Sequence, residues 1–96
     1  MFRVEKTAEF ITWLDGLRDE RAQLKISQRI FRLQGGNPGD WKSVGDGVSE
    51  MRIDYGPGYR VYFVRRAETL VILVAGGDKR TQNQDIAMAT KLARDL

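Results

Sequence analysis

The spacing of hydrophobic residues along the chain changes several times, and each spacing predicts a different element. Phe2–Glu5 alternates apolar and polar residues, which indicates a short strand. Thr7 then stands where a helix N-cap is expected. Apolar residues after it recur at positions i, i+3, i+4 and i+7, the pattern of one helix face, namely Phe10, Trp13, Leu14 and Leu17.

A second helix follows the first after a short turn. Asp19 can cap it, and an apolar stripe at helical spacing runs through Ala22, Ile26, Ile30 and Leu33. The sequence Gly-Gly-Asn-Pro-Gly at 35–39 ends this helix, because glycine and proline both terminate helices. The two segments therefore predict an antiparallel pair of amphipathic helices.

The middle of the chain reads as consecutive strands. Trp41–Val44 is a short strand candidate, and Val48–Asp54 alternates between two faces. Gly56-Pro57-Gly58 supplies a hairpin turn into Tyr59–Arg66. Leu70–Ala75 is apolar on both faces, so we expect it to lie inside the sheet with cover on both sides.

The last segment predicts a C-terminal helix. Thr81 and Gln84 have the spacing of a capping box. Apolar residues line one face after it, namely Ile86, Ala89, Ala93 and Leu96. The order β-α-α-β-β-β-β-α predicts one α+β domain over residues 1–96, a small antiparallel sheet with an N-terminal helical hairpin and a C-terminal helix.

Composition excludes several kinds of site. The chain of 96 residues contains no cysteine and no histidine. Disulfides, thiolate chemistry, histidine acid–base catalysis and most transition-metal sites are therefore ruled out, and we expect no cofactor and no metal. No apolar run reaches the length of a membrane span, and the N-terminus does not resemble a signal peptide. We expect a cytoplasmic protein.

Basic residues gather in the predicted sheet rather than in a tail. Residues 52–80 hold six basic and three acidic side chains, and the rest of the chain is balanced. Arg52 and Arg60 stand midway along strands, and Lys79-Arg80 follows the last strand. Guanidinium groups do not help a small sheet to pack, so they point to an anionic partner, and phosphate is the first candidate.

The alternative for each residue is an ordinary surface role. Arg52 stands between Glu50 and Asp54 on its strand face, so an ion pair explains it equally well. Arg60 has no carboxylate close by on its own strand, which favours function there. Arg65 and Arg66 fall at a strand end, where solvated charges are expected.

Two segments in combination, GVSEMRIDYGPGYRVYF and VILVAGGDKRTQNQDIAMA, resemble the RelE/ParE superfamily of toxins from bacterial type II toxin–antitoxin modules. The resemblance covers nearly the whole chain. It is nearest to the HigB-like, phage-derived branch described as addiction module killer proteins. It implies a cytoplasmic, metal-independent, ribosome-dependent endoribonuclease (an mRNA interferase) that inhibits translation and is silenced by a cognate antitoxin.

The resemblance also implies a site. Arg60, after Gly58-Tyr59, matches the arginine of the third family strand, and Lys79-Arg80 matches the basic pair after the last strand. Arg52 lies near the basic position of the preceding strand. Ile86 stands where RelE has a tyrosine, so that role is vacant. The candidate RNA-binding residues are Lys42, Arg52, Arg60, Lys79 and Arg80.

Cleavage of RNA by its own 2′-hydroxyl needs a proton acceptor, stabilisation of charge on the phosphate and a proton for the leaving 5′-oxygen. Arg60 with Arg80 can serve the phosphate. Lys79 and Glu50 are the candidates for proton transfer, and the residues do not decide between them. The candidate catalytic set is therefore Arg60, Arg80, Lys79, Arg52 and Glu50.

Two other functions stay open. A ParE-like member would poison DNA gyrase without cleaving RNA, and the vacant tyrosine position is compatible with that. A non-enzymatic remnant would only bind antitoxin and operator DNA, although a net charge of +3 is small for independent DNA binding. The expected partners are an adjacently encoded antitoxin, which could be of helix-turn-helix type, the ribosome and mRNA. The sequence leaves homo-oligomerisation open.

Overall fold

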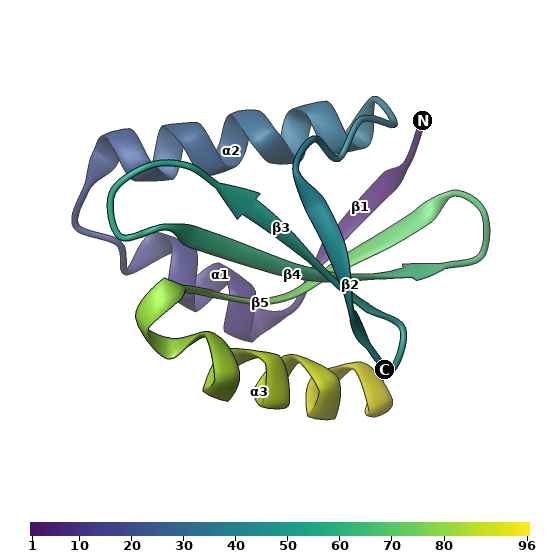
Figure 1. Ribbon diagram of the computed structural model, residues 1–96. Helices are drawn as coiled ribbons and strands as arrows, with labels where there is room; N and C mark the ends of the chain where they lie inside the picture. The colour runs from purple at the N-terminus through teal and green to yellow at the C-terminus, as the bar shows by residue number, and fades with distance from the viewer.

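A five-stranded sheet forms the centre of the molecule, in the order β1-β5-β4-β3-β2 (Figure 1). The computed structural model describes residues 1–96. The strands are β1 (Arg3–Lys6), β2 (Trp41–Gly45), β3 (Val48–Ile53), β4 (Tyr59–Arg66) and β5 (Leu70–Asp78). The helices are α1 (Ala8–Asp15), α2 (Glu20–Gln34) and α3 (Gln82–Arg94). The α+β fold and its element order are as the sequence predicted.

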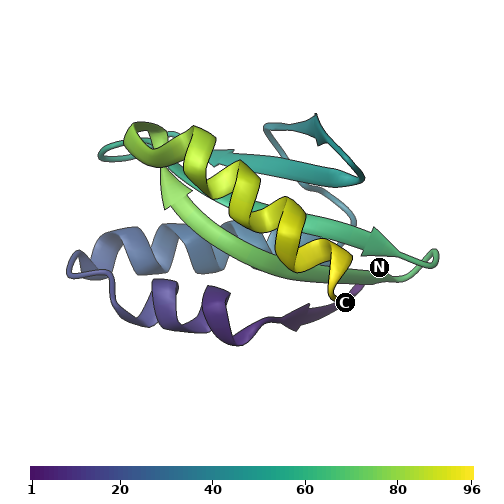
Figure 2. The same cartoon turned by 90° about the horizontal axis from the view of Figure 1, so that it is seen from below.

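Helices α1 and α2 cover one face of the sheet, and α3 covers the other (Figures 1 and 2). The helical hairpin begins at the predicted caps, because Thr7 accepts a hydrogen bond from the Phe10 amide and Asp19 accepts from the Arg21 and Ala22 amides. Its apolar stripe packs on alternate strand residues such as Met51, Val61 and Leu73. None of the helices has the length and apolar character needed to span a bilayer.

Strand β5 lies inside the sheet, between β1 and β4, as its two-sided apolar pattern predicted. Val71 and Leu73 pack against the helical hairpin, whereas Val74 and Ala75 pack against α3. A register shift between β4 and β5 occurs at Tyr62/Phe63, where Tyr62 pairs with Ala75 and Phe63 with Leu73. The bulge gives the α3 side two consecutive β5 residues.

Two expectations about local structure were wrong. Strand β1 pairs with β5 in parallel, so the sheet is mixed, although β2 to β5 form the antiparallel meander. Alternation within a strand carries no information about the direction of its partner. The capping box of α3 is also absent, because Thr81 makes no side-chain capping bond. Asp78 instead caps a single 3₁₀ turn, Lys79–Thr81, which leads into the helix.

Candidate functional site

Two arginines stand directly opposite one another on the α3 side of the sheet. The register pairs Arg52 of β3 with Arg60 of β4, and Arg60 in turn with Gly77 of β5. Directly opposed residues have their Cβ atoms about 4.5–5.5 Å apart and share a face, so two like charges lie side by side. Each guanidinium group therefore needs a carboxylate of its own or an external anion.

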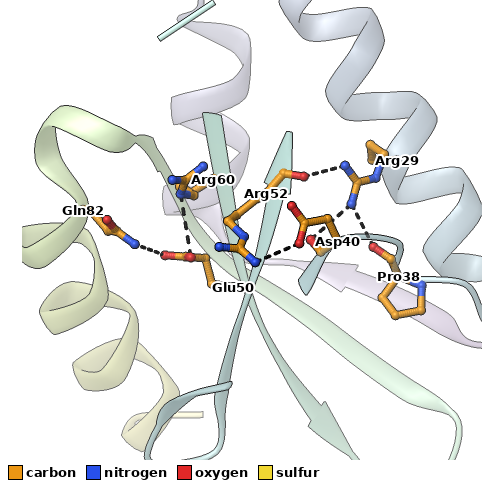
Figure 3. Close-up of polar contacts among 7 residues, drawn as sticks. All are labelled: Arg29, Pro38, Asp40, Glu50, Arg52, Arg60 and Gln82. Carbon is orange, nitrogen blue, oxygen red and sulfur yellow. Dashed lines mark hydrogen bonds and ion pairs between the residues drawn. The ribbon is translucent and has the colours of Figure 1, made fainter. Parts of the chain in front are cut away.

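Arg60 is held by a buried carboxylate from the next strand (Figure 3). Its Nε lies 3.7 Å from Oε1 of Glu50, and the two side chains are 14% and 0% exposed. Glu50 is the only charged residue that is buried in the protein. The pair is not visible along the sequence of β4, because the carboxylate comes from β3.

The other oxygen of Glu50 is fully engaged. Its Oε2 accepts hydrogen bonds from the Tyr62 hydroxyl at 3.1 Å and from the Gln82 amide at 2.8 Å. Burial raises the pKa of Tyr62, and the Glu50 carboxylate raises it further, so Tyr62 stays a neutral donor. Glu50 was a candidate base. In this structure it has no exposed surface, and the polar partners of its carboxylate are Arg60, Tyr62 and Gln82.

Arg52 is paired with a residue that the sequence did not suggest. Its Nη2 lies 2.8 Å from Oδ1 of Asp40, in the loop before β2, rather than near Glu50 or Asp54. Arg29 of α2 ties this region together (Figure 3), since it donates to the carbonyl groups of Arg52, Pro38 and Asp40. Arg52 keeps 36% of its side chain exposed, so it stays accessible to a ligand.

The basic pair after β5 is exposed. Lys79 and Arg80 lie on the 3₁₀ turn at the start of α3. Arg80 is 77% exposed and contacts Asp78 at 2.8 Å, and this hydrogen bond lowers the pKa of Asp78. Lys42 is exposed on edge strand β2, where it pairs with Glu50 and therefore shares its sheet face. The structure thus places Lys42, Arg52 and Arg60 on the α3 face, and Lys79 and Arg80 on the turn that leads into α3.

Asp85 is a feature of this face that sequence reasoning missed. It lies above Gly77, the register partner of Arg60, so closely that a Cβ on Gly77 would overlap its carboxylate. Burial raises the pKa of Asp85, and the hydroxyl of Thr81, which donates to Oδ2, opposes the rise. Glycine inside a strand is the signal that could have shown this close approach.

Ile86, which the resemblance to RelE aligns with a tyrosine, carries no polar group. Ile86 is half-buried and packs against the apolar cluster beneath α3. Any proton transfer at this face must therefore use other residues. Four titratable side chains at this end of the helix are not fully buried, namely Asp78, Lys79, Arg80 and Asp85. Asp78 and Arg80 are paired with each other, which leaves Lys79 and Asp85 as the candidates for proton transfer.

Comparison with known proteins assigns the chain to a family. Residues 12–94 match the family described as "Phage derived protein Gp49-like". A protein of Haemophilus influenzae (strain ATCC 51907 / DSM 11121 / KW20 / Rd), described as uncharacterized, is 52% identical over 94 residues, which cover 98% of this chain and 95% of the relative. The family match spans most of the sequence, including every strand from β2 to β5 and all of α3. The chain belongs to the Gp49-like family of phage-derived proteins.

Proposed function

We propose that this protein is the toxin of a type II toxin–antitoxin module, of the RelE/ParE superfamily and its HigB-like branch, and that it cleaves mRNA on the ribosome. Membership of a phage-derived family is consistent with a toxin of this kind. The observation that carries the nuclease proposal is the cross-strand pair Arg52 and Arg60, with Arg60 fixed by a buried carboxylate. Cations held in fixed positions beside the start of α3 suit a phosphate in the transition state.

Arg60 is the residue we assign to the scissile phosphate. Its contact with Glu50 uses Nε, which leaves the two terminal nitrogens to donate to phosphate oxygens. Arg52 stands beside it and adds a second cation. Arg80, Lys79 and Lys42, all exposed, are assigned to binding the flanking backbone of the RNA.

The reaction forms a bond from the 2′-oxygen to phosphorus and breaks the bond from phosphorus to the 5′-oxygen, which leaves a 2′,3′-cyclic phosphate. The 2′-hydroxyl must lose a proton, and the 5′-oxygen must gain one. Asp85, whose pKa is raised by burial, is our candidate for a proton-transfer group, with Lys79 as the second. The ribosome positions the RNA for attack, and such orientation lowers the activation free energy by on the order of 7–11 kcal/mol in well-aligned reactions.

The test is a purified translation system with the protein added in the presence and absence of ribosomes. We expect mRNA to be cut only on loaded ribosomes, with free RNA and gyrase supercoiling unchanged. Gyrase-linked DNA cleavage with intact mRNA would establish the ParE-like alternative. A protein that did neither would be a non-enzymatic remnant.

We assign antitoxin binding to the outward side of α2. Leu24 and Phe31 are 58% and 75% exposed there, one above the other at a spacing of two turns. Three exposed basic residues of the helix surround them, namely Arg21, Lys25 and Arg32. This combination fits an antitoxin segment that presents apolar side chains flanked by carboxylates.

The partner is tested with the product of the neighbouring gene. A stable complex on size-exclusion chromatography is expected with the wild-type protein, and Phe31→Glu should weaken it while mRNA cleavage persists. Met88→Glu, which changes an exposed residue of α3, is the matched control. A complex that Phe31→Glu leaves intact but Met88→Glu disrupts would move the antitoxin to the α3 side.

A further inference from the structure

The burial of Glu50 calls for an explanation beyond stability. Transfer of a carboxylate from water to a protein interior is costly even after the surroundings relax. A protein with an apolar residue of similar size at such a position is often as stable or more stable. Glu50 nevertheless has no exposed surface and lies on the sheet face whose neighbouring residues, Val48 and Tyr62, are also fully buried. A charge kept at such a position needs a role that an apolar residue cannot fill.

The contacts of Glu50 fix the carboxylate from two directions. Oε2 accepts from Tyr62 on the adjacent strand and from Gln82 at the first position of α3. The two donor residues, at positions 62 and 82, come from β4 and α3, so the orientation of the carboxylate depends on α3 being docked on the sheet. The carboxylate therefore keeps its orientation only while α3 stays packed against β4.

The remaining oxygen is directed at Arg60. Oε1 of Glu50 and Nε of Arg60 lie 3.7 Å apart, and neither atom has a hydrogen-bond partner elsewhere in the protein (Figure 3). The distance is longer than a hydrogen bond, so the pair is an ion pair whose atoms have no competing partner. Arg60 is 14% exposed, which leaves its side chain little room for other orientations.

We propose that Glu50 is a positioning residue that fixes the guanidinium group of Arg60 toward the substrate phosphate and makes that orientation depend on the docking of α3 through Gln82. This inference rests on the proposed function, since it gives Arg60 the phosphate as its ligand. Glu50 touches neither RNA nor the reacting atoms. Its effect on cleavage passes entirely through Arg60.

The experiment is a double-mutant cycle with Glu50→Gln, Arg60→Gln and the double variant. Glu50→Gln preserves the shape of the side chain and an oxygen that can accept from Tyr62 and Gln82, and it removes the charge that faces Arg60. Glu68→Gln is the control, because it also removes one negative charge but from an exposed turn. The readouts are kcat and KM for mRNA on loaded ribosomes, the pH profile, thermal melting and the NMR signal of the Arg60 Nε–H group.

We expect Glu50→Gln to lower kcat by about tenfold to a hundredfold with little change in KM, the size of effect that a small misplacement of a catalytic group produces. In the Arg60→Gln background the same change should cause no further loss. The pH profile should keep its shape, and the Arg60 signal should shift and broaden. The double variant should melt higher than Arg60→Gln, because it no longer buries an unpaired charge.

Additive losses of kcat, or loss of one limb of the pH profile in Glu50→Gln, would overturn the proposal and make Glu50 a proton-transfer group. An Arg60 signal that is unchanged in Glu50→Gln would also overturn it. The proposed function fails separately, by absence of cleavage in the wild-type protein. In that case the NMR signal of Arg60 and the melting temperatures of the double-mutant cycle would still show whether Glu50 positions Arg60.

Discussion

Two guanidinium–carboxylate pairs near the start of α3 differ most in how deeply they are buried. Arg80 and Asp78 are 2.8 Å apart, but Arg80 is 77% exposed. Arg60 and Glu50 are 3.7 Å apart, and Glu50 is fully buried. The shorter contact costs less to break, because water screens an exposed pair, whereas removing one partner of a buried pair costs about 3–5 kcal/mol. Distance alone would rank them in the wrong order.

The difference in burial suits the two arginines to different roles in the proposed site. Arg80 can leave Asp78 for a phosphate at little cost, so it suits adjustable binding of the RNA backbone. Arg60 cannot leave Glu50 without stranding a buried charge, so it suits a fixed position at the reacting phosphate. Arg52, with its half-exposed contact to Asp40, lies between these extremes.

The largest effect on folding should come from the sheet that carries both pairs. Leu73→Asp should prevent folding, because the charge would be unpaired in a fully buried position of the interior strand β5 at a cost above about 4 kcal/mol. Circular dichroism and thermal melting measure this. Leu24→Asp, at a position that is 58% exposed, is the control and should remain folded. A folded Leu73→Asp protein would contradict the sheet order.

The next largest effect should separate the buried arginine from the exposed ones. Arg60→Ala should lose most activity, but it also leaves Glu50 without its cation, so it costs stability. Arg60→Lys is the more specific test, since it keeps a positive charge near Glu50 and removes only the planar guanidinium group with its paired donors. We expect cleavage to fall by about a hundredfold to a thousandfold with melting nearly unchanged, the loss typical of one transition-state donor. A fully active Arg60→Lys protein would show that the phosphate is bound elsewhere.

The junction of α3 with the sheet should respond to a single methyl group. Gly77→Ala would place a Cβ on the Asp85 carboxylate, so the start of α3 must move. We expect a loss of about 1–3 kcal/mol in unfolding free energy, the usual cost of overpacking. Chemical denaturation measures it. Gly47→Ala tests the left-handed turn alone, since nothing lies near a Cβ there, and an equal loss in both would remove the role given to Asp85.

Smaller effects are expected at the exposed pair. Arg80→Ala and Lys79→Ala should each weaken cleavage by about threefold to tenfold, mainly through KM, because each removes a single solvated phosphate contact. The loss should shrink as salt increases. Arg65→Ala, at an exposed strand end away from the site, should have no effect. A loss at Arg80 as large as that at Arg60 would erase the distinction between the two pairs.

The smallest effect concerns the pH dependence of stability at Asp85. Because burial raises its pKa in the folded state, folding binds the proton more tightly, and stability falls as pH rises from about 3.8 through the raised pKa. Asp85→Asn cannot ionise, so it should melt higher than wild type at pH 7, and the gap should close near pH 3. Asp54→Asn, an exposed change, should show no such gap. A gap that is constant with pH would contradict the assignment.

Local patterns predicted the elements well. The structure has the caps Thr7 and Asp19 and the interior place of β5, which all follow from residues close together in sequence. The cap of α3 was wrong for a local reason, since the Thr81 hydroxyl donates to Asp85 instead of capping the helix. The direction of β1 was missed because a strand pattern does not name its partner.

The site was only partly visible in the sequence. Arg52 and Arg60 stood out as cations within apolar strands, which a core does not need. Their carboxylate partners did not, because Asp40 and Glu50 come from other segments and meet the arginines only when the strands are in register. The sequence singled out Glu50 only as a candidate base, and it did not single out Asp85.

The sequence by itself determined where the helices and strands form, which faces are apolar and where positive charge accumulates, because these depend on periodicity and on residues within a few positions of one another. Only the tertiary structure decided which charges are buried and which are free. Because α3 docks over β3 and β4, Glu50 is buried and is the fixed partner of Arg60. Burial depends on which distant segments pack together, and the energy of a charge depends on burial.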